Sequence, residues 1–163
     1  MGRLSFRITA AAAALVTVAA VVAGTTAAQA PGPPTGTREF VSLDRETRFR
    51  FVDNRPFRRE SAGDMLVIAG RLRTAGDNRR VGRFQATFVA TRGGSFERRF
   101  LAQGSGTFTV ADGDIVVQGL LDDSRSTDRL AIVGGTRAYA GARGTLEVTE
   151  TRTTTRFVFT FAG

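Results

Sequence analysis

Apolar residues along most of this chain alternate with polar ones, as they do in a strand that buries one face. Three stretches show the pattern most clearly: residues 47–53 with Phe49 and Phe51, residues 83–91 with Phe84, Ala86, Phe88 and Ala90, and residues 156–162 with Phe157, Phe159 and Phe161. Aromatic and β-branched residues at a period of two are typical of half-buried strands. Beyond residue 37 no segment sustains a helical apolar period. The pattern therefore predicts an all-β domain.

Glycines and short turns indicate how the strands connect. Asp112-Gly113 lies between two apolar runs and predicts a tight hairpin with both residues at positive φ, and residues 92–95 predict a second hairpin. Strands separated by turns at such short intervals form a sandwich or a barrel. Residues 65–69 and 115–121 are apolar on both faces, and glycines interrupt several strand-like runs, which favours a barrel. The alternative is a flat sandwich with the same glycines at bulges.

The first thirty residues resemble a secretory signal peptide. Arg3 and Arg7 precede an apolar, alanine-rich run over residues 8–23, and the segment ends in the small-residue pattern Ala28-Gln29-Ala30. The run is shorter than the roughly 20 residues of a membrane span, although a retained anchor is the alternative. We expect a signal peptide at 1–30, a Pro/Gly linker at 31–37 and a β-barrel domain at 38–163. The mature protein is then secreted, with no membrane span after cleavage.

Composition excludes several kinds of chemistry. The chain has no His and no Cys, so a Ser-His-Asp triad, a cysteine nucleophile and a His or Cys metal site are impossible. Five aspartates fit no calcium loop and are expected in turns or at strand edges: Asp112, Asp114, Asp122, Asp123 and Asp128. The net charge is +8, but acids alternate with many of the arginines, which indicates a solvated surface. Export argues against nucleic acid as a partner, and binding to an anionic cell-wall polymer is a minor hypothesis.

Three segments resemble signatures of one family and occur along the chain in the same order as in that family. Residues 131–145 read AIVGGTRAYAGARGT, residues 106–119 read GTFTVADGDIVVQG, and residues 51–54 read FVDN ahead of Gly63-Asp64. These are similar to signatures of dirigent proteins and of allene oxide cyclases. The resemblance implies an eight-stranded antiparallel β-barrel, in some members a homotrimer, with a pocket at one mouth. It also implies a small hydrophobic or phenolic ligand, and coupling, cyclisation or isomerisation without a metal or cofactor.

The resemblance assigns three candidate catalytic residues. Asp53 matches a pocket-facing aspartate that can transfer a proton, although a turn-capping role is the alternative. Arg143 matches an arginine that lines the pocket and holds an oxyanion, and the alternative is an arginine at the barrel rim that pairs with an acid. Tyr139, the only tyrosine, occupies an aromatic position that serves either packing or hydrogen bonding.

Two departures from the family pattern bear on activity. Ala138 stands where many dirigent proteins have an acid, and Arg137 replaces a glycine. The sequence therefore leaves two functions open. In the first, the barrel steers a cofactor-free reaction as an isomerase- or cyclase-like enzyme. In the second, it is a non-catalytic secreted barrel that binds a ligand or associates with the cell envelope.

Overall fold

A computed structural model describes residues 32, 34–53, 61–92, 101–122 and 124–163. The chain divides into two units, Met1–Ala30 and Pro31–Gly163. The predicted signal peptide and nearly all of the hairpin predicted at 92–95 lie outside the described residues, so both stay predictions. No helix in the described ranges is long and apolar enough to cross a membrane. The elements of the described chain are β1 (Gly36–Leu43), η1 (Asp44–Glu46), β2 (Arg48–Val52), β3 (Met65–Thr74), β4 (Arg80–Arg92), β5 (Leu101–Val110), β6 (Gly113–Asp122), β7 (Thr127–Gly135), η2 (Arg137–Tyr139), β8 (Gly144–Glu150) and β9 (Thr154–Phe161).

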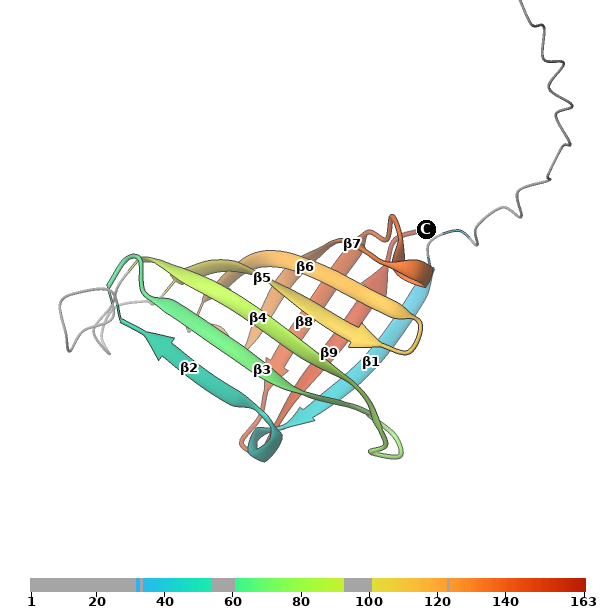
Figure 1. The fold of residues 1–163 in the computed structure, drawn as a ribbon, viewed down its shortest axis with the longest axis horizontal. Helices are drawn as coiled ribbons and strands as arrows, with labels where there is room; N and C mark the ends of the chain where they lie inside the picture. The colour runs from blue at the N-terminus through green and yellow to red at the C-terminus, as the bar shows by residue number, and fades with distance from the viewer. Residues whose placement is uncertain (1–31, 33, 54–60, 93–100, 123) are drawn as a thin grey trace, which may run out of the picture. The chain divides into compact units, whose positions relative to one another are not determined.

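The strands form one antiparallel sheet that closes on itself (Figure 1). Their order is β1-β9-β8-β7-β6-β5-β4-β3-β2, and β1 also pairs with β3 through Phe40–Thr74 and Val41–Arg73. Because β1 and β2 both pair with β3, they occupy one position in the wall. The result is a closed eight-stranded barrel, which confirms the predicted fold class. β1 starts at Gly36, so the predicted domain boundary at residue 38 falls inside this strand.

The short turn η1 divides the first wall position into two strands. β1 and β2 both pair with β3, as the pairs Phe40–Thr74 and Arg48–Ala69 show, but not in one continuous register. The chain between them contains three residues more than a continuous strand would need, and η1 takes them up. Glu46 anchors the turn to β3, because it accepts hydrogen bonds from Arg73 at 2.6 and 2.8 Å. Beyond the turn, β2 pairs only with β3 among the described strands. The barrel wall is therefore less continuous beside β2.

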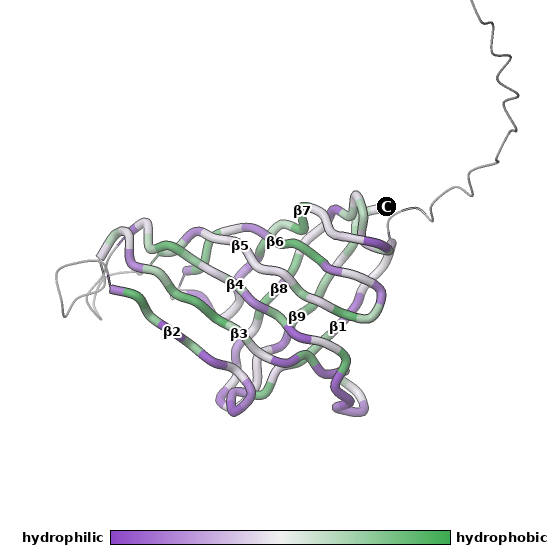
Figure 2. The backbone as a smooth tube through the Cα atoms, in the orientation of Figure 1, coloured by the Kyte–Doolittle hydropathy of each residue, from purple (hydrophilic) through white to green (hydrophobic). Residues whose placement is uncertain are grey.

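Hydrophobic and hydrophilic residues alternate along several strands (Figure 2). The burial of alternate positions, as in β4 and β9, assigns the apolar side chains to the interior of the barrel. The interior is rich in phenylalanine, and its rings pack edge-on or stacked: Phe108 lies 4.9 Å from Phe159 and 5.6 Å from Phe84, between ring centroids. The fully or nearly fully buried aromatic side chains are Phe40, Phe84, Phe88, Phe108, Tyr139, Phe157, Phe159 and Phe161. The predicted inward rows at 84/88 and 157/159/161 are thus confirmed.

The exterior of four neighbouring strands carries alternating charges. Arg156 on β9 donates to Glu39 on β1 at 2.6 Å, and Arg129 on β7 donates to Glu147 on β8 at 2.8 Å. All four side chains keep much of their surface in solvent. Such exposed pairs stabilise a fold by only about 0–1 kcal/mol. They agree with the interpretation of the arginines as part of a solvated surface.

The predicted hairpin at Asp112-Gly113 exists, but its turn lies one residue earlier. Val110 pairs with Gly113, so Ala111 and Asp112 form the turn. Among these four residues only Gly113 has a positive φ, which is 138°. A tertiary contact explains the difference. A Cβ at Gly113 would lie 2.2 Å from the Thr136 carbonyl oxygen, so the chain leading into η2 approaches too closely for a side chain.

Candidate functional site

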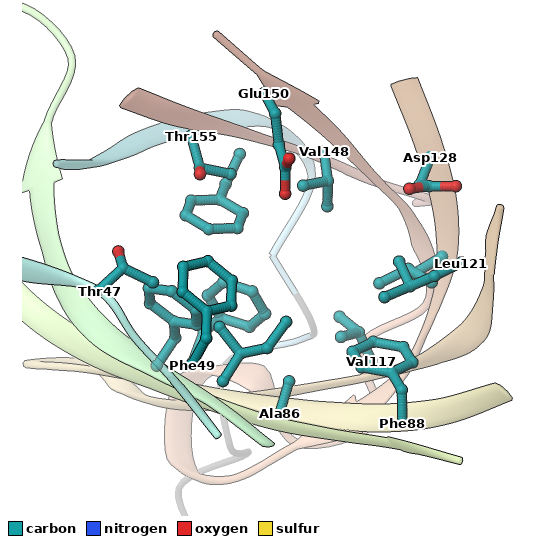
Figure 3. A pocket seen from close by; sticks show the side chains of 15 residues that line it. Thr47, Phe49, Ala86, Phe88, Val117, Leu121, Asp128, Val148, Glu150 and Thr155 are labelled. Carbon is teal, nitrogen blue, oxygen red and sulfur yellow. The ribbon is translucent and has the colours of Figure 1, made fainter. Parts of the chain in front are cut away.

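A cavity opens at the end of the barrel that holds the β6–β7 and β8–β9 turns, because residues next to these turns line it. Figure 3 shows the lining side chains. About 80 Å³ within it is open to water-sized molecules, whereas a single water needs roughly 10–15 Å³. The cavity therefore has room for a small group, with any larger part of a guest extending through the mouth. Its lining residues are Thr47, Phe49, Ile68, Phe84, Ala86, Phe88, Phe108, Val117, Leu121, Asp128, Leu130, Val148, Glu150, Thr155 and Phe157.

The lining is mainly apolar because the side chains that point inward from the surrounding strands are mostly apolar. The floor is aromatic: Phe157 lies 5.0 Å from Phe84 and 5.1 Å from Phe108, between ring centroids. Below it, Phe159 is fully buried. On the side of the mouth, Phe49 of β2 remains 60% exposed although it lines the cavity. The barrel below this floor is thus filled by aromatic side chains, and a small cavity remains above it, where Phe49 reaches solvent.

Two carboxylates enter this apolar space from neighbouring strands. Asp128 begins the inward row of β7, and Glu150 ends the inward row of β8. The strands pair Asp128 with Val148, two residues from Glu150, so both acids reach the same side of the cavity. Figure 3 shows both side chains on this side, and Thr155 beside Glu150. The hydroxyl groups of Thr155 and Thr47 are further polar groups of the lining.

The surroundings of these acids favour their neutral forms. Burial raises the pKa of Asp128, although the Asp122 backbone N–H opposes this by donating to Oδ1 at 3.1 Å. Burial also raises the pKa of Glu150, and the negative charges of Asp128 and Asp44 raise it further. Carboxyl groups with raised pKa values in a cleft are candidates for proton transfer at neutral pH.

Glu150 differs from the other glutamates that the structure describes. Glu39, Glu46 and Glu147 each form an ion pair with an arginine. For Glu150 no hydrogen bond or ion pair is found within the described part of the chain, in a protein with many arginines. Glu150 is also exposed to solvent, so the raised pKa of its carboxyl reflects only a small cost to stability, which a ligand or a proton would remove.

Stability measurements should detect this cost. Since the folded pKa of Glu150 is raised, the folded state holds its proton more tightly than the unfolded state. The stability from this proton is present below the unfolded pKa and is lost as the pH rises through the folded pKa. We expect Glu150→Gln to stabilise the protein at pH 7 by a few tenths of a kcal/mol, because the group is partly exposed and solvent weakens the effect.

Urea unfolding at pH 7 and at pH 4 measures this difference. The gain from Glu150→Gln should shrink at the lower pH, where the wild-type carboxyl is protonated. Glu147→Gln is the matched control, because it makes the same change on the outer face of the same strand. A loss of stability in Glu150→Gln at pH 7 would contradict the prediction.

The three residues predicted from the sequence lie elsewhere. Asp53 follows β2 at the cavity end of the barrel but is not among the described lining residues. Arg143 and Tyr139 lie in the connection between β7 and β8, at the opposite end, because antiparallel strands place successive connections at alternate ends. The catalytic roles expected for these residues stay predictions.

Tyr139 and Arg143 organise the closed end. Tyr139 is fully buried, stacks on Phe161 with ring centroids 5.7 Å apart, and accepts a hydrogen bond from Arg38 at 2.7 Å. Burial raises the pKa of the Tyr139 phenol. Arg143 is exposed and donates to the carbonyl oxygens of Val133 and Ala142 at 2.6 and 2.9 Å. Tyr139 thus both packs and forms a hydrogen bond, whereas Arg143 binds backbone carbonyl groups and not the acid that the rim alternative expected.

The sequence predicts Asp128 in a turn or at a strand edge and does not single out Glu150. A signal for both was present in the period-two pattern. Asp128 continues the row of Leu130 and Ile132, and Glu150 continues the row of Leu146 and Val148. An acid that continues the alternating series of buried apolar residues in a strand is expected to point into the barrel.

The fold and the cavity define a class of protein: an antiparallel β-barrel closed at one end, with an apolar cavity that carries acids at the other. The chain belongs to the dirigent-like family, because the family model described as "Dirigent-like protein" matches residues 37–161. The resemblance found in the sequence is thereby confirmed. Among curated proteins, none matches this chain.

Solved structures support the same fold. A pyocyanin demethylase superposes with a TM-score of 0.64 at 22% identity, over 77% of this chain and 99% of that one. A pterocarpan synthase dirigent protein gives a TM-score of 0.55 at 16% identity, over 77% and 85% of the two chains. A Diels–Alderase from Streptomyces koyangensis gives 0.56 at 17% identity, over 77% and 63%. At these identities the likeness concerns the barrel alone.

Proposed function

We propose that this barrel binds a small apolar molecule in the cavity and steers a cofactor-free cyclisation, isomerisation or coupling. One observation carries the proposal: two carboxyl groups with raised pKa values face an apolar cavity, and one of them lacks a protein partner in the described chain. Solved structures with a similar barrel include a pterocarpan synthase dirigent protein and a Diels–Alderase, which supports guided bond formation as the class of reaction.

The geometry suggests a division of roles. The aromatic floor limits how a guest lies, which lowers the entropy cost of reaching a reactive conformation. Glu150, at the mouth, accepts a proton from the guest when ionised and returns it when protonated. Asp128 is held by the Asp122 backbone N–H and orients a polar group of the guest. Neither step needs a metal or a nucleophilic side chain.

The elimination reaction of 5-nitrobenzisoxazole tests for such a base. A carboxylate removes the ring C–H proton, the N–O bond breaks, and a coloured cyanophenolate forms, after which the carboxyl returns its proton to water. We expect the protein to accelerate this reaction, with a rate that rises as the pH rises through the raised pKa of Glu150. Glu150→Gln should lower the rate about 100-fold.

Two further measurements make the result interpretable. Glu147→Gln, on the outer face of β8, should keep the full rate. The unreactive analogue 5-nitroindole should inhibit competitively, which reports binding without reaction. Binding of the analogue without acceleration would reject steering and leave a binding protein. Absence of both binding and acceleration would overturn the whole proposal.

A further inference from the structure

Two kinds of lining residue in the cavity attract positive charge. Its walls include five phenylalanine rings, whose π faces carry partial negative charge: Phe49, Phe84, Phe88, Phe108 and Phe157. Its ionisable lining residues, within the described chain, are Asp128 and Glu150. Ring faces and carboxylates both attract a positive charge, and aromatic walls are a known means of holding quaternary ammonium groups.

The described lining of the cavity contains no arginine, although the chain is strongly basic. The net charge is +8, and arginines pair with Glu39, Glu46 and Glu147 on other surfaces. An anionic guest would meet two carboxylates and no arginine among the described lining residues, while Arg125, outside the lining, acts on Asp128. The anionic guest would lose its hydration without gaining a partner, which is costly in an apolar space. A cationic guest would instead supply the partner that Glu150 lacks.

We infer that the guest is an organic cation, with an aromatic ring or a substituted ammonium group that enters between the phenylalanine rings and faces Asp128 and Glu150. This inference rests on the proposed function and names the substrate class of the same cavity. About 80 Å³ of open space accommodates the charged head of such a molecule, and its remainder extends through the open mouth beside Phe49. The open mouth also lets the cation keep part of its hydration.

Three guests of one shape test the charge preference directly. Phenyltrimethylammonium, tert-butylbenzene and benzenesulfonate share a ring and a compact substituent, and differ mainly in charge. Titrations followed by NMR of the full protein give a dissociation constant for each. We expect the cation to bind about tenfold more tightly than the neutral compound, which corresponds to about 1.4 kcal/mol, and the anion to bind more weakly than both.

Variants then show whether the two acids set the preference. Glu150→Gln and Asp128→Asn should each weaken the binding of phenyltrimethylammonium several-fold and leave that of tert-butylbenzene nearly unchanged. Glu147→Gln, a matched exterior change on β8, should leave both unchanged. Raised salt should weaken the cation selectively, because the mouth is open to solvent.

The outcomes separate this inference from the function on which it rests. Equal binding of the cation and the neutral compound, or tighter binding of benzenesulfonate, would overturn the charge preference and leave the ligand-binding barrel in place. If none of the three binds, and 5-nitroindole does not bind either, the proposed function fails. If the cation still binds more tightly than the neutral compound in both acid variants, the preference comes from the rings alone, and the role of Asp128 and Glu150 is rejected.

Discussion

Replacing Phe159 by alanine is expected to destabilise the barrel by about 4 kcal/mol, the range for a large aromatic side chain removed from a packed core. The side chain is fully buried and contacts rings on three sides, with centroids 4.9 Å from Phe108, 5.8 Å from Phe40 and 6.3 Å from Phe161. Few neighbours can move into the space, because they belong to strands fixed in a closed wall. Urea unfolding should show the loss, with a midpoint of thermal unfolding lower by roughly 15 °C.

Val158→Ala is the matched control. Val158 precedes Phe159 on β9 and faces outward, partly exposed, so its truncation should cost less than about 1 kcal/mol. Similar losses in both variants would show that β9 does not divide its side chains between core and surface as described. The aromatic packing beneath the cavity would then not be the rigid floor on which the proposed function depends.

Gly144→Ala is expected to cost about 3 kcal/mol, for two separate reasons. The residue has a φ of 144°, which residues with a side chain rarely adopt. In addition, a Cβ at this position would lie 2.0 Å from the Thr160 carbonyl oxygen on β9. That atom belongs to the backbone of a paired strand, so the contact is relieved only if β8 and β9 separate. Unfolding in urea measures the change in stability.

Gly141→Ala separates the two causes. Gly141 has a positive φ of 74°, but a Cβ there would meet no atom within 4 Å. Only the conformational cost applies, and the expected loss is about 1 kcal/mol. If both variants lose the same amount, the close approach between β8 and β9 contributes nothing. The glycine of the family-like signature would then matter for its backbone angles alone.

The closed and open halves of the barrel explain why the signature segment and the candidate site are separate. η2, Tyr139 and Arg143 complete one end through backbone and side-chain hydrogen bonds, including Ala138 N–H to the Asp112 carbonyl oxygen at 3.1 Å. The cavity with Asp128 and Glu150 lies at the other end. In this chain the most recognisable segment therefore supports the barrel, while less recognisable strand ends supply the acids.

The sequence by itself determined the all-β class, the inward rows of phenylalanine and the family. These properties depend on local alternation and short motifs, because a period of two assigns each side chain to one face of its strand. It also predicted the β5–β6 hairpin, although the turn register depended on the contact between Gly113 and Thr136.

Only the tertiary structure decided which side chains share a cavity. Asp128 and Glu150 lie on consecutive strands and share one side of the cavity because the register of β7 on β8 pairs Asp128 with Val148. Closure also left Phe49 exposed at the mouth and filled the opposite end with Tyr139. Strand register, barrel closure and the packing of side chains in the barrel interior depend on contacts between strands. The alternation of residues along a single strand therefore does not predict them.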